Sequence, residues 1–294
     1  MSDAGNGPMA RPREFPSDGR DSLRALAWSP PTVASDALAP VIVLLHGLGD
    51  GADIWRPMMA TWRMPLSVVA FDLPGHGRSP WLGEAHYDVP GLADRVAKAL
   101  AAQGIHRPVL VGHSLGARIA VELAARSSLY PRGTILVDMS GRDGDETTSA
   151  VAAHLEALMV GAPTLEGLVK LVGDRLPLAD PQAFAMAVPP MATEADGSWR
   201  VALDPAIRQL LAPVRDPEEI WHLLSCLQGP AAVVRGVYSA VMDRRMAVRI
   251  AETIPWRPAF IETVDSAGHA VPLEQPALLA RAVEKCLRGW RVAA

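Results

Sequence analysis

The chain has 294 residues, of which 49% are hydrophobic and 20% are charged. This balance excludes an intrinsically disordered chain and a collagen-like repeat, because so many apolar residues can form a large buried core. Twenty-eight basic and 32 acidic residues give a net charge of −4, which provides no basic surface for nucleic acid or for an anionic membrane.

Cysteine content and the N-terminal sequence predict the cellular compartment of the protein. Cys226 and Cys286 are its only cysteines, which excludes a disulfide-rich scaffold and favours a reducing compartment. Charged residues interrupt the N-terminus, so we expect no signal peptide, and no apolar run has the length of a membrane span. We therefore predict a cytoplasmic protein without membrane partners.

The first 40 residues carry weak structural signals. Residues 1–20 are rich in Gly, Pro and charge, and we expect a flexible tail. Residues 22–28 are predicted to form an edge strand, followed by a loop over 29–40.

Six short apolar runs, rich in β-branched residues, predict strands that are buried on both faces. They cover 41–47, 66–71, 108–113, 133–138, 230–236 and 259–264. Segments with helical periodicity separate several of them, most clearly 89–103, 115–129 and 276–290. This alternation predicts an α/β fold with a mostly parallel sheet and helices on both of its faces.

The alternation is interrupted over residues 141–224, where we find no convincing buried strand. Helix-like pieces at 150–160 and 165–176 stand among many prolines. Because a structureless loop of this length is unusual in a compact domain, we expect an inserted helical subdomain. The core domain then comprises 21–140 and 225–294, so the 294 residues form one sheet domain with an insertion.

A glycine-rich turn over residues 47–52 follows the first buried strand and allows two interpretations. It matches the G-x-G-x-x-G/A pattern of dinucleotide sites, with Asp72 in the position of the ribose-binding acid. Alternatively, its flexible backbone lets the N–H of Leu48 approach a reacting carbonyl oxygen, with His46 in a structural role. We favour the second interpretation.

The sequence Gly112-His113-Ser114-Leu115-Gly116 joins an apolar strand to a helix. This is the structural context in which a G-x-S-x-G motif forms a sharp turn that exposes a nucleophilic serine. The N–H of Leu115 then lies at the helix N-terminus, where it favours a developing negative charge. We predict Ser114 as the nucleophile and the amides of Leu48 and Leu115 as oxyanion donors.

With this motif, the chain resembles the α/β-hydrolase family. The resemblance also rests on HGLG at 46–49, on FDLPGHGRS at 71–79 and on SAGHAVPLEQP at 266–276. It implies an eight-stranded, mostly parallel sheet, a triad in the order Ser, acid, His, and neither a metal nor an organic cofactor. It also implies that 141–224 forms a lid.

His269 matches the histidine of this family, and it supplies the base that a serine nucleophile needs. The acid is less clear, because Ala240 stands where the family usually places it, in the loop after the seventh strand. Asp138 at the end of the preceding strand is our first choice, since it can reach the same histidine. Asp243 is the alternative, although it also suits a helix N-cap, and a site without a carboxylate remains the third option.

Apolar residues near these motifs predict the substrate. Trp81, with Trp55, Met58 and Met59, is a candidate for an apolar cleft, although core packing is the commoner role of such residues. Apolar side chains of the expected lid, Met186, Met191, Trp199 and Trp221, favour an uncharged, fairly hydrophobic substrate.

We therefore predict a serine hydrolase that cleaves a small ester, lactone or thioester through an acyl-enzyme. Hydrolysis of a carbon–carbon bond is one alternative. A scaffold that only binds a small molecule is another, and Ala240 is the reason to consider it.

Overall fold

The computed structural model describes residues 11–15, 17, 22–29, 40–83, 87–126, 129–140, 145–212, 216–256 and 259–292. The expected loop over 29–40 lies mostly outside these residues. So do much of the expected tail and the first four residues of the expected lid.

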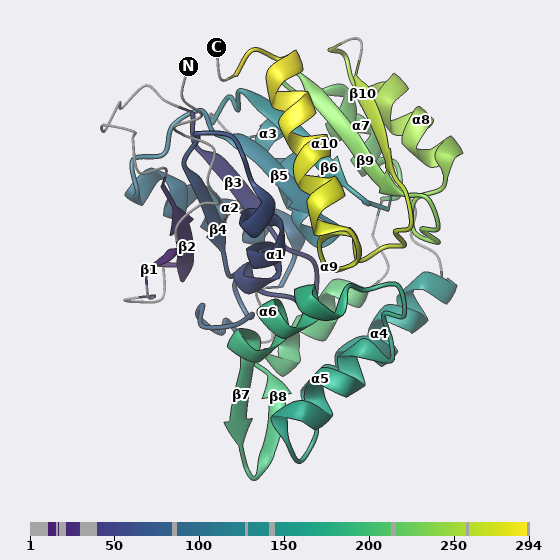
Figure 1. Ribbon diagram of the computed structural model, residues 1–294. Coiled ribbons are helices and arrows are strands. Elements are labelled where there is room, and N and C mark those ends of the chain that lie inside the picture. Colours follow the sequence, from purple (N-terminus) through teal and green to yellow (C-terminus); the bar gives the residue numbers. More distant parts are fainter. Residues whose placement is uncertain are drawn as a thin grey trace, which may run out of the picture.

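Eight strands form one sheet that crosses the molecule (Figure 1). Their order is β1 (Arg13–Phe15), β2 (Ala25–Trp28), β4 (Val68–Phe71), β3 (Ile42–Leu45), β5 (Val109–His113), β6 (Gly133–Val137), β9 (Ala231–Gly236) and β10 (Phe260–Val264). From β4 to β10 all neighbours are parallel, whereas β2 is antiparallel to β4 and β1 to β2. The predicted eight-stranded, mostly parallel sheet is confirmed.

Helices cover both faces of this sheet, and the strand residues alternate between the two layers. Ile42 and Leu44 contact the layer of α1 (Arg56–Thr61), α9 (Val271–Glu274) and α10 (Pro276–Gly289). Val43 and Leu45 contact the opposite layer, formed by α2 (Val89–Ala102), α3 (Leu115–Arg126), α7 (Glu219–Ser225) and α8 (Arg244–Thr253). Burial on both faces explains why these strands are apolar throughout.

The N-terminal segment corrects two expectations. Residues 13–15 lie in the expected tail but form β1, and β2 is therefore an inner strand instead of the edge. The reason is tertiary: Glu14 of β1 accepts a hydrogen bond from Arg24 at 3.0 Å and another from Arg78 at 2.6 Å. Such distant partners leave no local signal in a polar sequence.

The described part of the segment between β6 and β9 is mostly helical. It contains α4 (Asp145–Val160), α5 (Leu165–Gly173), α6 (Pro181–Met191), a 3-10 helix η2 (Pro205–Leu211) and α7. Leu155 and Leu168 of this segment belong to the same buried cluster as the sheet residues Ile42 and Leu44. The segment therefore packs on the sheet domain (Figure 1).

A two-stranded hairpin inside this segment was not expected. It consists of β7 (Ala192–Ala195) and β8 (Ser198–Val201), joined by Asp196 and Gly197. Both turn residues have positive φ, 54° and 71°, which two-residue hairpin turns require. The Asp-Gly pair was the available sequence signal, but the polar and partly exposed strands beside it lack an apolar pattern.

Candidate active site

Ser114 occupies the sharp turn between β5 and α3. Its φ is 52°, in the left-handed region that residues other than glycine rarely adopt. A Cβ atom on Gly116 would lie 2.1 Å from the carbonyl oxygen of Leu45, and one on Gly112 would lie 2.2 Å from that of Gly116. Glycine at both positions is therefore necessary for α3 to begin this close to the sheet.

Ser114, His269 and Asp138 form a continuous hydrogen-bonded series. The distance from Ser114 Oγ to His269 Nε2 is 3.1 Å, and that from His269 Nδ1 to Asp138 Oδ1 is 2.8 Å. The residues follow β5, β10 and β6, whose carboxyl ends meet at one edge of the sheet because these strands are parallel. The three residues selected from the sequence thus lie together.

Asp138 is fully buried, and three donors surround its carboxylate. Besides His269, the backbone N–H of Gly236 donates to Oδ2 at 2.8 Å, and the hydroxyl of Ser239 donates to Oδ1. Ser239 Oγ itself accepts from the amides of Val241 and Met242, each at 3.1 Å. These two bonds occupy its lone pairs, so its single proton is directed at Asp138.

The alternative acid, Asp243, has a different position. Its side chain accepts a hydrogen bond from the amide of Met246 at 2.6 Å and is the N-cap of α8. Ala240 is exposed in the loop after β9. Of the two carboxylates considered, only Asp138 is hydrogen-bonded to His269 in the described residues.

The backbone on both sides of His269 is held by buried side chains. The amide of Gly268 donates to Glu274 Oε2 at 2.6 Å, and the carbonyl oxygen of His269 accepts from His113 Nε2 at 2.8 Å. Glu274 and His113 are only 4% and 3% exposed. These contacts fix the loop that carries the imidazole.

Leu115 directly follows Ser114, and Leu48 lies in the loop after β3, the strand beside β5 in the sheet. Within the part of the chain that the structure describes, neither residue's amide has a hydrogen-bond acceptor. Unpaired donors near a nucleophile can stabilise a developing oxyanion.

Two buried histidines support the loop that carries Leu48. His46 Nε2 accepts from the amide of Leu73 at 2.9 Å, and His76 Nε2 accepts from the amide of Gly49 at 3.1 Å. Burial lowers the pKa of each imidazole to about 3, so both are neutral and able to accept. This agrees with the structural role expected for His46 and gives His76 a similar one.

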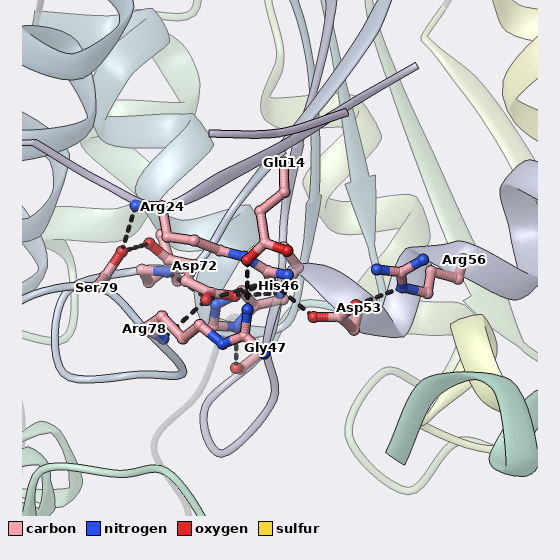
Figure 2. Close-up of polar contacts among 11 residues, drawn as sticks. Glu14, Arg24, His46, Gly47, Asp53, Arg56, Asp72, Arg78 and Ser79 are labelled. Atoms are coloured by element: carbon pink, nitrogen blue, oxygen red, sulfur yellow. Dashed lines mark hydrogen bonds and ion pairs between the residues drawn. The ribbon is translucent and has the colours of Figure 1, made fainter. Parts of the chain in front are cut away.

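A buried ionic cluster holds the same region from the opposite side, and Figure 2 shows it around the guanidinium of Arg24. Nη1 of Arg24 lies 2.6 Å from Asp53 and 3.3 Å from Asp72, while Nε lies 3.0 Å from Glu14. Burial disfavours the charge on Arg24, but Asp72 and Asp53 outweigh it and raise its pKa. The cluster joins β1, the residue before β2, the short 3-10 helix that follows the turn after β3, and the loop after β4.

Asp72 also bears on the dinucleotide interpretation. Besides Arg24, its carboxylate accepts from the amides of Ala52 at 2.7 Å and Arg78 at 2.9 Å. It is 1% exposed and so cannot reach the ribose of a bound cofactor. Asp72 therefore has a structural role and does not act as the ribose-binding acid of a dinucleotide site.

A pocket lies between the turn after β3 and the inserted segment. Gly49, Asp50, His154 and Leu273 line it, and the remaining wall consists of aliphatic or methionine side chains: Leu158, Val172, Leu176, Val188, Met191 and Val201. It encloses about 20 Å³, which is room for about one water molecule. A larger group must displace some of these side chains on entry.

The four aromatic and methionine residues proposed for an apolar cleft do not line this pocket. Trp55, Met58 and Met59 are at most 1% exposed and pack in the core. Trp81 is 56% exposed, so its contact with a substrate stays a prediction.

The described ranges contain no group of three or more side chains that could hold a metal ion. No helix within them has the length and apolar character needed to cross a membrane.

Comparison with known proteins identifies the family. The family model described as "Alpha/beta hydrolase family" matches residues 42–282, which is most of the chain. The chain belongs to the α/β hydrolase family. The turn at Ser114, the loop that carries His269 and the sheet described above are thus parts of an α/β hydrolase.

Similar proteins have several assigned activities. "Putative carbamate hydrolase RutD" of Escherichia coli O44:H18 is 38% identical over 117 residues, which cover 40% of this chain and 41% of that protein. An esterase structure from Mycobacterium tuberculosis has a TM-score of 0.72 at 26% identity and covers 96% of this chain and 92% of that one. The structure of E-2-(acetamidomethylene)succinate hydrolase has a TM-score of 0.81 at 21% identity, with 94% and 99% covered.

The sequence patterns did not predict several residues that lie around the site of this α/β hydrolase. Ser239 stands directly before Ala240, and its position beside the expected acid was the available signal. Arg24 is a charged residue in front of an apolar strand, which is a weak hint of a buried ion pair. Asp50 and His154 carry no motif, because their proximity arises from the packing of the inserted segment on the sheet domain.

Proposed function

We propose that this α/β hydrolase cleaves an ester, lactone or thioester of a small, fairly hydrophobic substrate through an acyl-enzyme. The observation that carries the proposal is the series Ser114–His269–Asp138, with separations of 3.1 and 2.8 Å. These distances allow a proton to pass from the serine to the imidazole.

In the proposed mechanism, Ser114 Oγ attacks the carbonyl carbon of the substrate while His269 Nε2 takes the hydroxyl proton. Asp138 orients the imidazole and stabilises its protonated form. The amides of Leu48 and Leu115 bind the oxyanion, and His269 then returns the proton to the leaving group. In the second half of the reaction, water attacks the acyl carbon while His269 takes a proton from it. His269 then returns this proton to Ser114 Oγ, which leaves as the hydroxyl.

Two observations support the substrate class and the role of the inserted segment. The pocket wall is mostly apolar, which suits an uncharged acyl group. Most of its side chains come from the segment between β6 and β9, which we propose as a lid. The assigned activity of the relative from E. coli adds carbamates, which also react through a tetrahedral intermediate, to the bonds worth testing.

The alternative of a scaffold that only binds its ligand was motivated by Ala240. The hydrogen bond between His269 and Asp138 argues against it, because a carboxylate from β6 takes the place of the expected acid. Carbon–carbon bond hydrolysis uses the same three residues and stays a second candidate reaction.

Fluorophosphonate labelling tests the proposal. We expect the full chain to react covalently with the probe and to hydrolyse 4-nitrophenyl butyrate. Both activities should disappear in Ser114→Ala, because only a nucleophilic serine attacks the phosphorus atom. Labelling that persists in Ser114→Ala, or a folded wild type that neither labels nor hydrolyses, would contradict it.

A further inference from the structure

Two polar side chains, Asp50 and His154, interrupt the apolar wall of the pocket. Asp50 belongs to the turn after β3 and His154 to α4, so one comes from the sheet domain and the other from the inserted segment. The two parts pack against each other at Gly49. A Cβ atom at this position would lie 3.0 Å from Leu158 and 4.0 Å from His154, which both belong to α4.

Asp50 is close to the turn that carries Ser114. It lies two residues after Leu48, and its Oδ2 is 3.7 Å from Nδ1 of His113, the residue before Ser114. Burial disfavours the charged form of His113, but the Asp50 carboxylate outweighs it and raises the pKa of this imidazole. At 3.7 Å the two atoms form an ion pair that is longer than a hydrogen bond, and the buried Nδ1 of His113 has no hydrogen-bond partner in the described residues.

The carboxylate of Asp50 thus has unused acceptor capacity. Its side chain is 20% exposed, and it accepts no hydrogen bond from the residues that the structure describes. An ionised carboxylate has about four lone-pair sites, and a partly buried one is stabilised by donors that fill them. Apart from the side facing His113, no described residue fills these sites, and Asp50 is one of the residues that line the pocket.

His154 offers the complementary group. Burial lowers its pKa, so the imidazole is neutral at neutral pH and carries one N–H donor. Its side chain makes no hydrogen bond within the described parts of the chain. The two side chains therefore present an acceptor and a donor to the same small space.

An amide or carbamate group has the matching pattern, because its N–H donates and its carbonyl oxygen accepts. We propose that Asp50 and His154 form a recognition site for a neutral amide or carbamate on the acyl part of the substrate. Once the side chains of the pocket have moved apart to admit this group, the N–H binds Asp50 and the carbonyl oxygen binds His154, while the aliphatic wall contacts the attached alkyl group. This inference rests on the proposed function, since it concerns a substrate of Ser114.

Two esters that differ in one group test the Asp50 contact. 4-Nitrophenyl N-acetylglycinate and 4-nitrophenyl 4-oxopentanoate have the same length and carbonyl positions, but the first has an N–H where the second has a CH₂. Relative to the ratio of the two esters' rate constants in buffer, we expect the full chain to show kcat/KM about tenfold higher for the N-acetylglycinate, the effect of one hydrogen bond to a partly exposed charged group. Rates are corrected for hydrolysis in buffer.

Three variants assign the preference to residues. Asp50→Ala should bring the ratio of the two kcat/KM values close to the ratio of the two esters' rate constants for hydrolysis in buffer, because the amide group also activates its ester by electron withdrawal. His154→Leu should lower both values and keep the ratio, because both esters retain the carbonyl that His154 binds. Asp174→Ala is the matched control: this exposed carboxylate of the inserted segment pairs with Lys170, and its loss should leave the ratio at the wild-type value.

The ratio is compared within each variant, so a general loss of activity cancels. A wild-type ratio near the ratio in buffer, or an unchanged ratio in Asp50→Ala, would overturn the inference and leave Asp50 as a solvated carboxylate. The β-alanyl 4-nitrophenyl ester carries an ammonium group where the butyryl ester has a methyl group. If the protein prefers the β-alanyl ester over the butyryl ester more strongly than it prefers the N-acetylglycinate over the 4-oxopentanoate, the site binds a cation and the neutral assignment is overturned. If neither ester is hydrolysed in a Ser114-dependent way, the proposed function itself fails.

Discussion

At the residue scale, the site depends on which residue supplies the carboxylate that pairs with His269. Asp138 is fully buried, and burial without donors is costly for a carboxylate. The imidazole of His269, the amide of Gly236 and the hydroxyl of Ser239 supply the donors. Asp243 uses its side chain to cap α8 and is not available for the same task.

The pair Asp138→Asn and Asp243→Asn separates these two roles. We expect Asp138→Asn to lower kcat for 4-nitrophenyl butyrate by roughly 10³- to 10⁴-fold, because an amide no longer holds the imidazole in the reactive tautomer. Asp243→Asn should keep kcat within about twofold, since asparagine is an equally good N-cap. Steady-state kinetics of both purified variants provides the measurement, and the reverse ranking would contradict our assignment.

At the element scale, the nucleophile turn depends on close contact between β3 and α3. The Gly116 position meets the Leu45 carbonyl at a distance that no Cβ tolerates. The same contact places the first amides of α3 beside the loop that carries Leu48. A glycine pattern that is visible in the sequence thus sets the spacing between two elements.

Gly116→Ala tests this contact. We expect it to lower the free energy of unfolding by about 1–3 kcal/mol, because α3 must move away from β3. Hydrolysis should fall as well, since the amide of Leu115 moves with the helix. Urea denaturation and ester turnover measure the two effects.

Gly173→Ala is the control for that variant. Gly173 ends α5, and a Cβ there would meet no atom within 4 Å. Its free energy of unfolding should stay the same or rise by up to about 1 kcal/mol, because alanine restricts the unfolded chain. Equal losses in both variants would show that the contact with Leu45 is not the cause.

At the scale of the whole molecule, one arginine connects segments that are distant in sequence. Arg24 binds Glu14 of β1, Asp53 of η1 (Ala52–Trp55) and Asp72 after β4. These segments surround the loop with His46 and Leu48, as Figure 2 shows for His46. The N-terminal strand is therefore tied to the support of the candidate site.

Arg24→Leu should lower the free energy of unfolding by about 3–5 kcal/mol, because it leaves Asp72 buried without its cation and Asp53 with only the partly exposed Arg56. Arg78→Leu is the matched control. Its side chain is 62% exposed, and its loss should cost no more than about 1 kcal/mol. Thermal or urea unfolding compares the two, and similar losses would argue against a central role for Arg24.

The sequence by itself determined the parts that depend on local patterns. Apolar runs and helical periods predicted the central strands and the long helices, because burial imposes those periods on any chain. The glycines at 112 and 116 predicted the nucleophile turn, since only glycine permits its backbone. His269 was found through a local motif.

The tertiary structure alone decided which distant groups meet. The sheet order places β6 between β5 and β9, so the end of β6 lies beside Ser114 and within reach of His269. No local pattern encodes that neighbourhood, and the choice of Asp138 over Asp243 depended on it. The pairing of β1 with β2 and the meeting of Asp50 with His154 have the same physical cause: contacts between distant segments depend on how finished elements pack.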